Sequence, residues 1–471
     1  MNSYTKLFKN SIIFAIGNLG SKLVSILLVP LYTYYLSTGE YGTVDLIITT
    51  TNMLVPVVSL SMAEASLRFA MDKSVDKKRT ITNAIYIAVI GLILSLIAFP
   101  VLSYLNVFGE YLFLFYGYLF FNIVDIILAQ YLRGIGYSRA FAANGIILTL
   151  STGLLNILFI VNFGMGVNGY LISLILANLI SIIYLAFNIR FWEVFNLKLL
   201  NKDLQKELIK YSIPLIPNSL MWSAINSSSR YFILFFIGVQ ANGLFAVASK
   251  IPLVVNIASQ IFSQAWQISA IEEAESNTSK DFYTNIFKYL SVAMFLSVSL
   301  VLLILKPLFG FAFSSDYYMA WQSTPFLLLG AVFSSFSNIL GATYIANKQT
   351  IGVFRTSIWG GLLSLVANAV LIPTIGLVGA GISSCMSFGL MFYLRFKDTQ
   401  KFNNMKINWK VFNGSLGIVL LQTLVLLLNL NYIIEVLINL GLLIIFLLVN
   451  KGFLLFVKDI IIIGLRKIIK K

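Results

Sequence analysis

The feature that most constrains this chain is a series of long apolar segments that continues along almost its whole length. Each segment is roughly 18 residues or longer, which is the length that an α-helix needs to cross a lipid bilayer. The series predicts an all-α, polytopic membrane protein with about fourteen transmembrane helices. We expect the spans at 10–36, 41–67, 80–104, 111–133, 140–162, 168–190, 210–237, 241–268, 284–306, 319–346, 351–372, 377–396, 411–428 and 432–450.

The composition supports a chain that is embedded in lipid over its whole length. Hydrophobic residues make up 59% of the 471 residues, and charged residues make up only 11%. A soluble domain carries roughly a quarter charged residues. Because so few polar side chains cannot cover a water-soluble surface of this size, the apolar excess must face lipid.

The charged residues alternate between the predicted loops. The formal net charge is +15, and basic clusters such as Lys77-Lys78-Arg79 alternate with loops such as 106–110 and 163–167, which contain no Lys or Arg. We expect the chain in the bacterial cytoplasmic membrane, and the positive-inside rule then places both termini and the middle connector in the cytoplasm. Lys306 is the exception, since it lies beside an external loop. The basic residues form no continuous stripe, which argues against nucleic acid as a partner.

The chain lacks histidine and the sequence motifs of several well-known enzyme classes. It has no histidine and one cysteine, Cys385, which lies inside an apolar segment. There is no Walker A sequence, no Ser/His/Asp set and no cluster of metal ligands. We therefore predict a protein that is not an enzyme, with no catalytic residues, no metal site and no cofactor.

The two halves of the chain resemble each other. An ungapped alignment places Lys9-Asn10-Ser11-Ile12 on Lys210-Tyr211-Ser212-Ile213, and Gly42 on Gly243. A second block in the same order aligns Asn156 with Asn368, Gly164 with Gly376 and Gly169 with Gly381.

This repeat predicts a domain organisation. Six helices per repeat is an even number, so both halves enter the membrane from the cytoplasm, and substrate sites in such transporters lie between the halves. We expect an N-terminal six-helix lobe at 1–190, a cytoplasmic connector at 191–209, a C-terminal six-helix lobe at 210–397, two additional transmembrane helices at 398–450 and a cytoplasmic amphipathic tail at 451–471.

Five charged residues lie well inside predicted spans, where each costs about 2.5–3.5 kcal/mol on insertion scales and needs a partner or a water-filled cavity. They are Lys22, Asp45, Asp125, Arg230 and Lys250. Helical periodicity places most of them on polar stripes of the helices that open the two repeats. The further polar residues of these stripes are Asn18, Asn52, Asn226, Gln260 and Gln264.

The stripes predict a substrate site. Three cations, Lys22, Arg230 and Lys250, against one acid, Asp45, give a positive cavity that suits a phosphate or diphosphate. Asp45 and Asp125 are candidates for ion coupling, and Asp125 is equally well explained as a structural partner of a cation. The alternative for the Ser, Asn and Gln residues is hydrogen bonding between helices without a ligand.

Three segments resemble one family. The stretch NSIIFAIGNLGSKLVSILLVPLYTYYLSTGEYGTVDLI is similar to the start of Wzx-type polysaccharide flippases, and its LS-x-x-EYG turn at 36–42 is the most distinctive part. AQYLRGIGYSRAFAANG and LLSLVANAVLIPTIGLVGAGISS resemble later segments of the same family. These flippases belong to the multidrug/oligosaccharidyl-lipid/polysaccharide exporter (MOP) superfamily, which also contains MATE drug exporters and lipid II flippases.

The resemblance implies a fold of twelve to fourteen helices with two six-helix lobes and alternating access. It implies flipping of an undecaprenyl-diphosphate-linked oligosaccharide for capsule, exopolysaccharide or teichoic-type polymer, with membrane lipids, a polymerase and glycosyltransferases as partners. The family uses cavity cations, and Lys22, Arg230 and Lys250 lie in spans where they would serve. The alternatives are a MATE-like, cation-coupled exporter of small molecules and a scaffold for polymer-assembly enzymes. Because MATE exporters rely on acidic residues in the membrane, Lys22 in the first span favours the anionic substrate.

Overall fold

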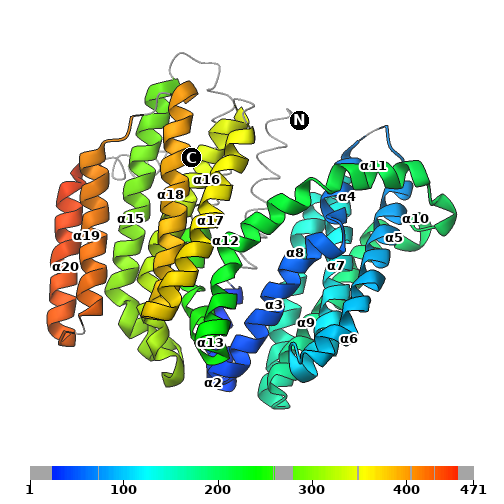
Figure 1. Ribbon diagram of the computed structural model, residues 1–471, viewed down its shortest axis with the longest axis horizontal. Coiled ribbons are helices and arrows are strands. Elements are labelled where there is room, and N and C mark those ends of the chain that lie inside the picture. The colour runs from blue at the N-terminus through cyan, green and yellow to red at the C-terminus, as the bar shows by residue number, and fades with distance from the viewer. Residues whose placement is uncertain are drawn as a thin grey trace, which may run out of the picture. The chain divides into compact units, whose positions relative to one another are not determined.

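A computed structural model describes residues 24–72, 74–257, 259, 279–346, 350–403, 406–428 and 430–453. Every regular element in these ranges is a helix, which confirms the predicted all-α class (Figure 1). Eleven helical segments in the described ranges are long and apolar enough to cross a membrane. The protein is therefore a multi-pass membrane protein, and the number of fourteen spans stays a prediction.

The chain divides into two compact units, Met1–Val247 and Ala248–Lys471, which we describe separately. The division falls after the predicted connector because the helices that follow the connector pack against the first unit. The lobe boundaries that we drew from the sequence repeat stay a prediction.

The first unit is a bundle whose helices agree with most of the predicted spans. α7 lies at its centre and packs against α4, α8 and α9. The helices are α2 (Val29–Tyr35), α3 (Thr38–Val58), α4 (Met62–Met71), α5 (Lys77–Ser95), α6 (Phe99–Tyr104), α7 (Leu112–Gly134), α8 (Ser138–Asn156), α9 (Gly166–Ile189), α10 (Phe191–Val194), α11 (Lys202–Ser212), α12 (Leu215–Phe236) and α13 (Val239–Ala248).

The prediction of one continuous span over 41–67 is wrong, because the chain breaks between α3 and α4. Leu60 and Ser61 adopt φ angles of 49° and 52°, a left-handed conformation that ends a helix. Pro56 lies in the last turn of α3, and proline weakens a helix from within. α5 packs tightly on this break, since a Cβ atom added to Gly91 would lie 1.9 Å from the carbonyl oxygen of Val58.

The connector is anchored to the start of α5 by one buried side chain. The Asn83 side-chain oxygen accepts hydrogen bonds from the backbone N–H of Asn201 and from the Gln205 side chain, each at 3.0 Å. Its Nδ2 donates to the Leu199 carbonyl at 3.2 Å. The charged connector is therefore fixed to the first unit rather than being a free linker.

The second unit is also a helical bundle, and its α18 packs along both α16 and α17. Four phenylalanines from α15, α16, α18 and α19 form an aromatic cluster in its core: Phe287, Phe336, Phe392 and Phe412. The helices are α15 (Ser279–Ala312), α16 (Thr324–Ala346), α17 (Thr350–Ile375), α18 (Leu377–Asn403), α19 (Trp409–Leu427) and α20 (Tyr432–Val449).

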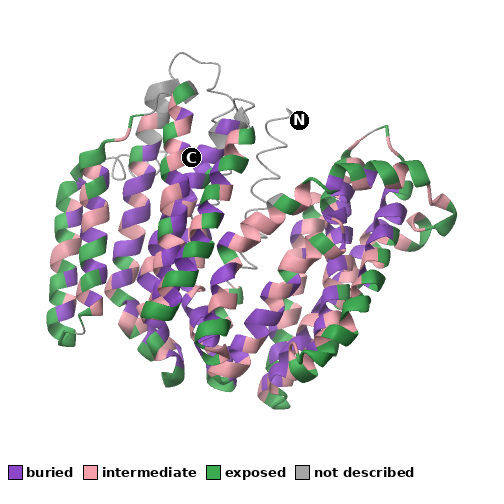
Figure 2. Cartoon of the chain, viewed as in Figure 1, coloured by how far each residue is buried: buried purple, intermediate pink, exposed green. Residues whose placement is uncertain are grey.

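The exception of Lys306 to the charge pattern has a structural reason, because its side chain forms an ion pair rather than lying free in an external loop. Its Nζ lies 2.6 Å from Glu435 Oε2 and 2.9 Å from the Leu426 carbonyl, and 4.4 Å from the ring centre of Trp321. The pair joins α15 to the α19–α20 hairpin. Most residues of α20 are otherwise exposed or half-buried, which suits a helix that faces lipid (Figure 2).

The aligned residues of the sequence repeat have the same structural roles in their own halves. Gly164 and Gly376 both lie in the turn before the last helix of their repeat, with φ angles of 62° and 65° that favour glycine. Asn156 and Asn368, one helix earlier, are both fully buried. These two matched pairs agree in conformation and burial, as the repeat predicts, while residues 9–12 of the first aligned block lie outside the described residues.

Candidate functional site

Two aligned glycines of the repeat bring the opening helices of the two halves into contact. α3 begins with a capping box in which Ser37 and Glu40 bond each other's backbone N–H groups. A Cβ atom on Gly42 would lie 2.2 Å from the Val239 carbonyl oxygen, and one on Gly243 would lie 1.9 Å from that of Thr38. The LS-x-x-EYG turn is therefore a packing motif, and its last position accepts only glycine because a Cβ atom there would clash with the Val239 carbonyl oxygen.

An ion pair lies less than one helical turn further along α3. Arg230 Nε donates to Asp45 Oδ2 at 2.5 Å, and the two side chains are only 14% and 9% exposed. The guanidinium also donates from Nη1 to the Asn226 carbonyl at 3.1 Å, and lies 5.6 Å from the ring centre of Phe245. α3, α12 and α13 thus all contribute to the surroundings of Arg230.

A second polar contact continues the same interface one turn deeper. The hydroxyl groups of Thr50 and Tyr231 lie 2.9 Å apart, and they join α3 to α12 again. The Tyr231 hydroxyl also lies 4.0 Å from the Met53 sulfur. Asp45 and Arg230 belong to the predicted polar stripes, whereas Thr50 and Tyr231 were not among the residues predicted for them.

This geometry revises the predicted electrostatics. The sequence placed three cations against one acid, and the structure pairs one of those cations with that acid. A buried ion pair is neutral as a unit, and removing either partner leaves an uncompensated charge that costs about 3–5 kcal/mol. Arg230 is therefore available to a substrate only when Asp45 releases it, and the contributions of Lys22 and Lys250 stay a prediction.

The other predicted residues are in several places. Lys22, Asn18, Gln260 and Gln264 lie outside the described residues. Lys250 is half-buried directly after α13. Asn52 and Asn226 are exposed, and the Asn226 side chain donates to the Trp222 carbonyl at 2.9 Å, as expected for local helix bonding.

Asp125 belongs to a different cluster of the first unit. Its carboxylate accepts a hydrogen bond from the Ser181 hydroxyl, which lies 2.7 Å from Asn144 Oδ1. All three side chains are buried and come from α7, α9 and α8. None of the ion pairs between described residues includes Asp125. Its partners are neutral, so the structural alternative of pairing with a cation has no support in the described ranges.

One charged residue near the end of the predicted span 377–396 is buried. Arg395 is only 1% exposed, and it links α18 to α16 and α17 through neutral acceptors. From the sequence alone, a basic residue near the end of a span is expected to face the cytoplasm. Its burial can be recognised only once the hydrogen-bond acceptors on the neighbouring helices are known. Among the described residues, no group of three His, Cys, Asp or Glu side chains could hold a metal ion.

Comparison with known proteins identifies the family and the fold. The family model described as "Polysaccharide biosynthesis protein" matches residues 7–267. No curated protein sequence matches this chain. The fold is similar to that of the lipid II flippase MurJ in its inward closed conformation, with a TM-score of 0.71 and 15% identity over 96% of this chain and 100% of that one.

Two further solved structures share the fold at lower similarity. A mutant of the Vibrio cholerae MATE transporter VcmN gives a TM-score of 0.57 at 14% identity, over 84% of this chain and 96% of that one. A MOP superfamily transporter from Pyrococcus furiosus gives 0.57 at 14% identity, over 84% and 95%. These likenesses confirm the resemblance to flippases and MATE transporters in fold. Because the family model covers more than half of the sequence, the chain belongs to the polysaccharide biosynthesis protein family.

Proposed function

We propose that the chain flips an undecaprenyl-diphosphate-linked oligosaccharide, a repeat unit of capsule, exopolysaccharide or teichoic-type polymer, from the cytoplasmic to the outer leaflet. The observation that carries the proposal is the Arg230–Asp45 pair between α12 and α3, because an arginine at this position supports binding of a phosphate group. The family and the MurJ-like fold support a lipid-linked substrate. Assembly with a polymerase and glycosyltransferases belongs to the same proposal.

The chemistry of the pair suits a diphosphate. A guanidinium presents a planar fork of donors that matches phosphate oxygens bidentately. The diphosphate carries more negative charge than the single carboxylate of Asp45, so it competes for Arg230 with the help of Lys22 and Lys250. The polyprenyl tail stays in lipid while the polar head occupies the site, and the repeats then exchange the side from which the site is reached.

The test is transport by the purified protein in vesicles. The variant Arg230→Gln with Lys250→Gln removes two of the three proposed phosphate ligands, and we expect it to abolish flipping of a labelled prenyl-diphosphate oligosaccharide. Its matched control is Arg190→Gln with Lys198→Gln, which removes two exposed cations of the first unit. Normal flipping by the first variant, at an unchanged protein level, would contradict the proposal.

The second candidate function is a cation-coupled exporter of small molecules. The observations that favour it are the MATE-like fold and the two buried acids, Asp45 and Asp125. On this alternative, deleting the gene raises drug sensitivity and leaves surface polysaccharide unchanged. Loss of surface polymer with unaltered drug sensitivity would exclude it, and transport by the purified protein would exclude a scaffold without transport activity.

A further inference from the structure

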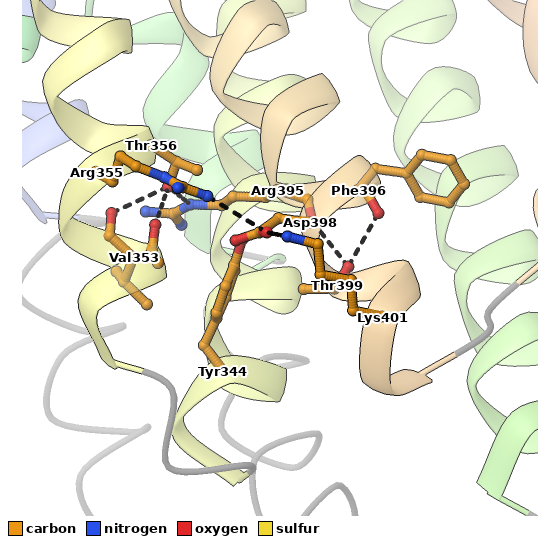
Figure 3. A network of polar contacts seen from close by, with 10 residues as sticks. Tyr344, Val353, Arg355, Thr356, Arg395, Phe396, Asp398, Thr399 and Lys401 are labelled. Atoms are coloured by element: carbon orange, nitrogen blue, oxygen red, sulfur yellow. Dashed lines mark hydrogen bonds and ion pairs between the residues drawn. The ribbon is translucent and has the colours of Figure 1, made fainter.

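A second cationic cluster lies in the second unit, where α16, α17 and α18 come together (Figure 3). At its centre is Asp398 of α18, whose carboxylate has three partners. Oδ2 accepts a hydrogen bond from the Tyr344 hydroxyl at 3.0 Å. Oδ1 lies 2.9 Å from Lys401 Nζ and 3.4 Å from Arg355 Nη2. One carboxylate oxygen is therefore shared between two cations.

One turn further into the same helix, Arg395 adds a third cation. Its Nε donates to the Thr356 hydroxyl at 3.1 Å, and its Nη2 donates to the Ser357 hydroxyl at 3.0 Å. Its Nη1 donates to the Ser337 carbonyl at 2.7 Å. Each of these acceptors is neutral, and none of the ion pairs between described residues includes Arg395.

The charges of this network do not balance. Arg355, Arg395 and Lys401 face a single carboxylate, so the labelled network in Figure 3 carries an excess of positive charge. A buried cation with only neutral acceptors raises the electrostatic potential around it, because the interior screens charge weakly. An anion placed against the two outer cations would lower that energy.

The outer cations are arranged to accept such an anion. The side chains of Arg355 and Lys401 are 63% and 73% exposed, so most of their N–H donors point away from Asp398. Because both contact the same oxygen atom, their charged groups lie within about two hydrogen-bond lengths of each other. A phosphate group can bridge two cations at that separation through different oxygens.

The depth of the cluster in the membrane identifies the ligand class. Lys401 is the last residue of the span Leu377–Lys401, and Arg355 lies in the first turn or so of the span Ile351–Ile375. On the orientation that the loop charges predict, this is the cytoplasmic headgroup level, where lipid phosphates lie and where basic pockets between helices bind anionic headgroups.

We infer that Arg355 and Lys401, supported by Arg395, form a binding site for the phosphate group of a membrane lipid at the cytoplasmic end of the second unit. The phosphate could belong to an anionic phospholipid or to a prenyl diphosphate that approaches the transporter. The site shares no residue with the Arg230–Asp45 pair, and the inference does not depend on the proposed function.

The experiment measures lipid retention by native mass spectrometry on the full-length protein in detergent. The probes are phosphatidylglycerol, phosphatidylcholine as a lipid without net charge, and undecaprenyl diphosphate. The variant is Arg355→Gln with Lys401→Gln, and the control is Arg190→Gln with Lys198→Gln, which removes the same charge from exposed positions of the first unit. Both positions of the variant are exposed, but their shared partner Asp398 is only 15% exposed, so the melting temperature is measured for every variant. A second variant adds Asp398→Asn to the two changes, which removes the unpaired carboxylate, and it should lose anionic lipid to the same extent.

We expect the variant to weaken binding of an anionic probe by roughly thirty-fold, the effect of losing two basic contacts of about 1 kcal/mol each. Phosphatidylcholine binding and the control should change by less than about two-fold. A loss for phosphatidylglycerol assigns the site to a structural lipid, and a loss confined to undecaprenyl diphosphate assigns it to substrate loading. An unchanged affinity for both anionic probes, or an equal loss in the control, overturns the inference. Flipping is not needed for this assay, so a failed transport proposal would leave its result intact.

Discussion

The Asp45–Arg230 pair can be dissected by a double-mutant cycle that separates a structural role from a substrate role. Asp45→Asn leaves the guanidinium without its carboxylate, and Arg230→Gln leaves the carboxylate without its guanidinium. The side chains are 9% and 14% exposed, so the residual charge in each single variant is poorly solvated. We expect each single change to lower the free energy of unfolding by about 3–5 kcal/mol.

The double variant should behave differently from the sum of its parts. Once both charges are gone, no uncompensated charge remains, and two amide-bearing side chains can hydrogen-bond across the same gap. We expect it to recover at least about 2 kcal/mol relative to additivity, which is a large coupling energy for residues in contact. Thermal unfolding of the detergent-solubilised protein measures this coupling as a difference of melting temperatures.

Transport then provides the second measurement on the same proteins. If Arg230 binds the diphosphate, the double variant is stable but still fails to flip the lipid-linked substrate. If the pair only holds α3 against α12, the double variant regains both stability and flipping. Additive destabilisation would refute the electrostatic reasoning, and restored flipping would refute the role of Arg230 as a phosphate ligand.

Three further predictions follow from other contacts. Gly42→Ala places a Cβ atom 2.2 Å from a backbone oxygen and should abolish folded protein, whereas Gly39→Ala meets nothing closer than 3.8 Å and should be tolerated; size-exclusion profiles in detergent distinguish them. Lys306→Gln or Glu435→Gln should each lower the free energy of unfolding by about 3–5 kcal/mol, which is measured as a lower melting temperature. The double change should lower the melting temperature less, because no buried charge is left unpaired. Asp125→Asn keeps the shape and the hydrogen-bonding capacity of a buried side chain, so we expect normal yield; flipping that no longer responds to an imposed proton or sodium gradient would assign ion coupling to Asp125, and an unaltered response would refute it.

The sequence predicts the helices well because a bilayer imposes one length on every span. It fails where the fold is decided by local backbone geometry or by a neighbour. The break after Val58 arises from two left-handed residues, Leu60 and Ser61, inside a segment whose apolar length is sufficient for one helix. Apolar length carries no information about such a break, although Pro56 gave a partial signal.

At the Asp45–Arg230 site, helical periodicity identified candidate residues, and helix packing determined which of them meet. Helical spacing singled out Asp45 and Arg230, yet it could not show that they pair, since that depends on the close approach at Gly42 and Gly243. Arg395 was missed because its acceptors are hydroxyl and carbonyl groups of two other helices. These partners are distant from Arg395 in the sequence, so the residues next to the arginine do not indicate that it is buried.

The neutral pair also bears on how binding and movement can be coupled in this family member. In our proposal the substrate takes Arg230 from Asp45, so binding the diphosphate and weakening the α3–α12 contact are a single event. A ligand can shift a conformational equilibrium only by the difference in its affinity for the two states. Breaking the pair costs about 3–5 kcal/mol, and the cavity must recover that amount through Lys22, Lys250 and the second phosphate. A substrate with one phosphate supplies fewer of these contacts, so we expect prenyl monophosphates to be moved far more slowly than diphosphates; equal rates for the two would show that opening the pair does not depend on the charge of the head group.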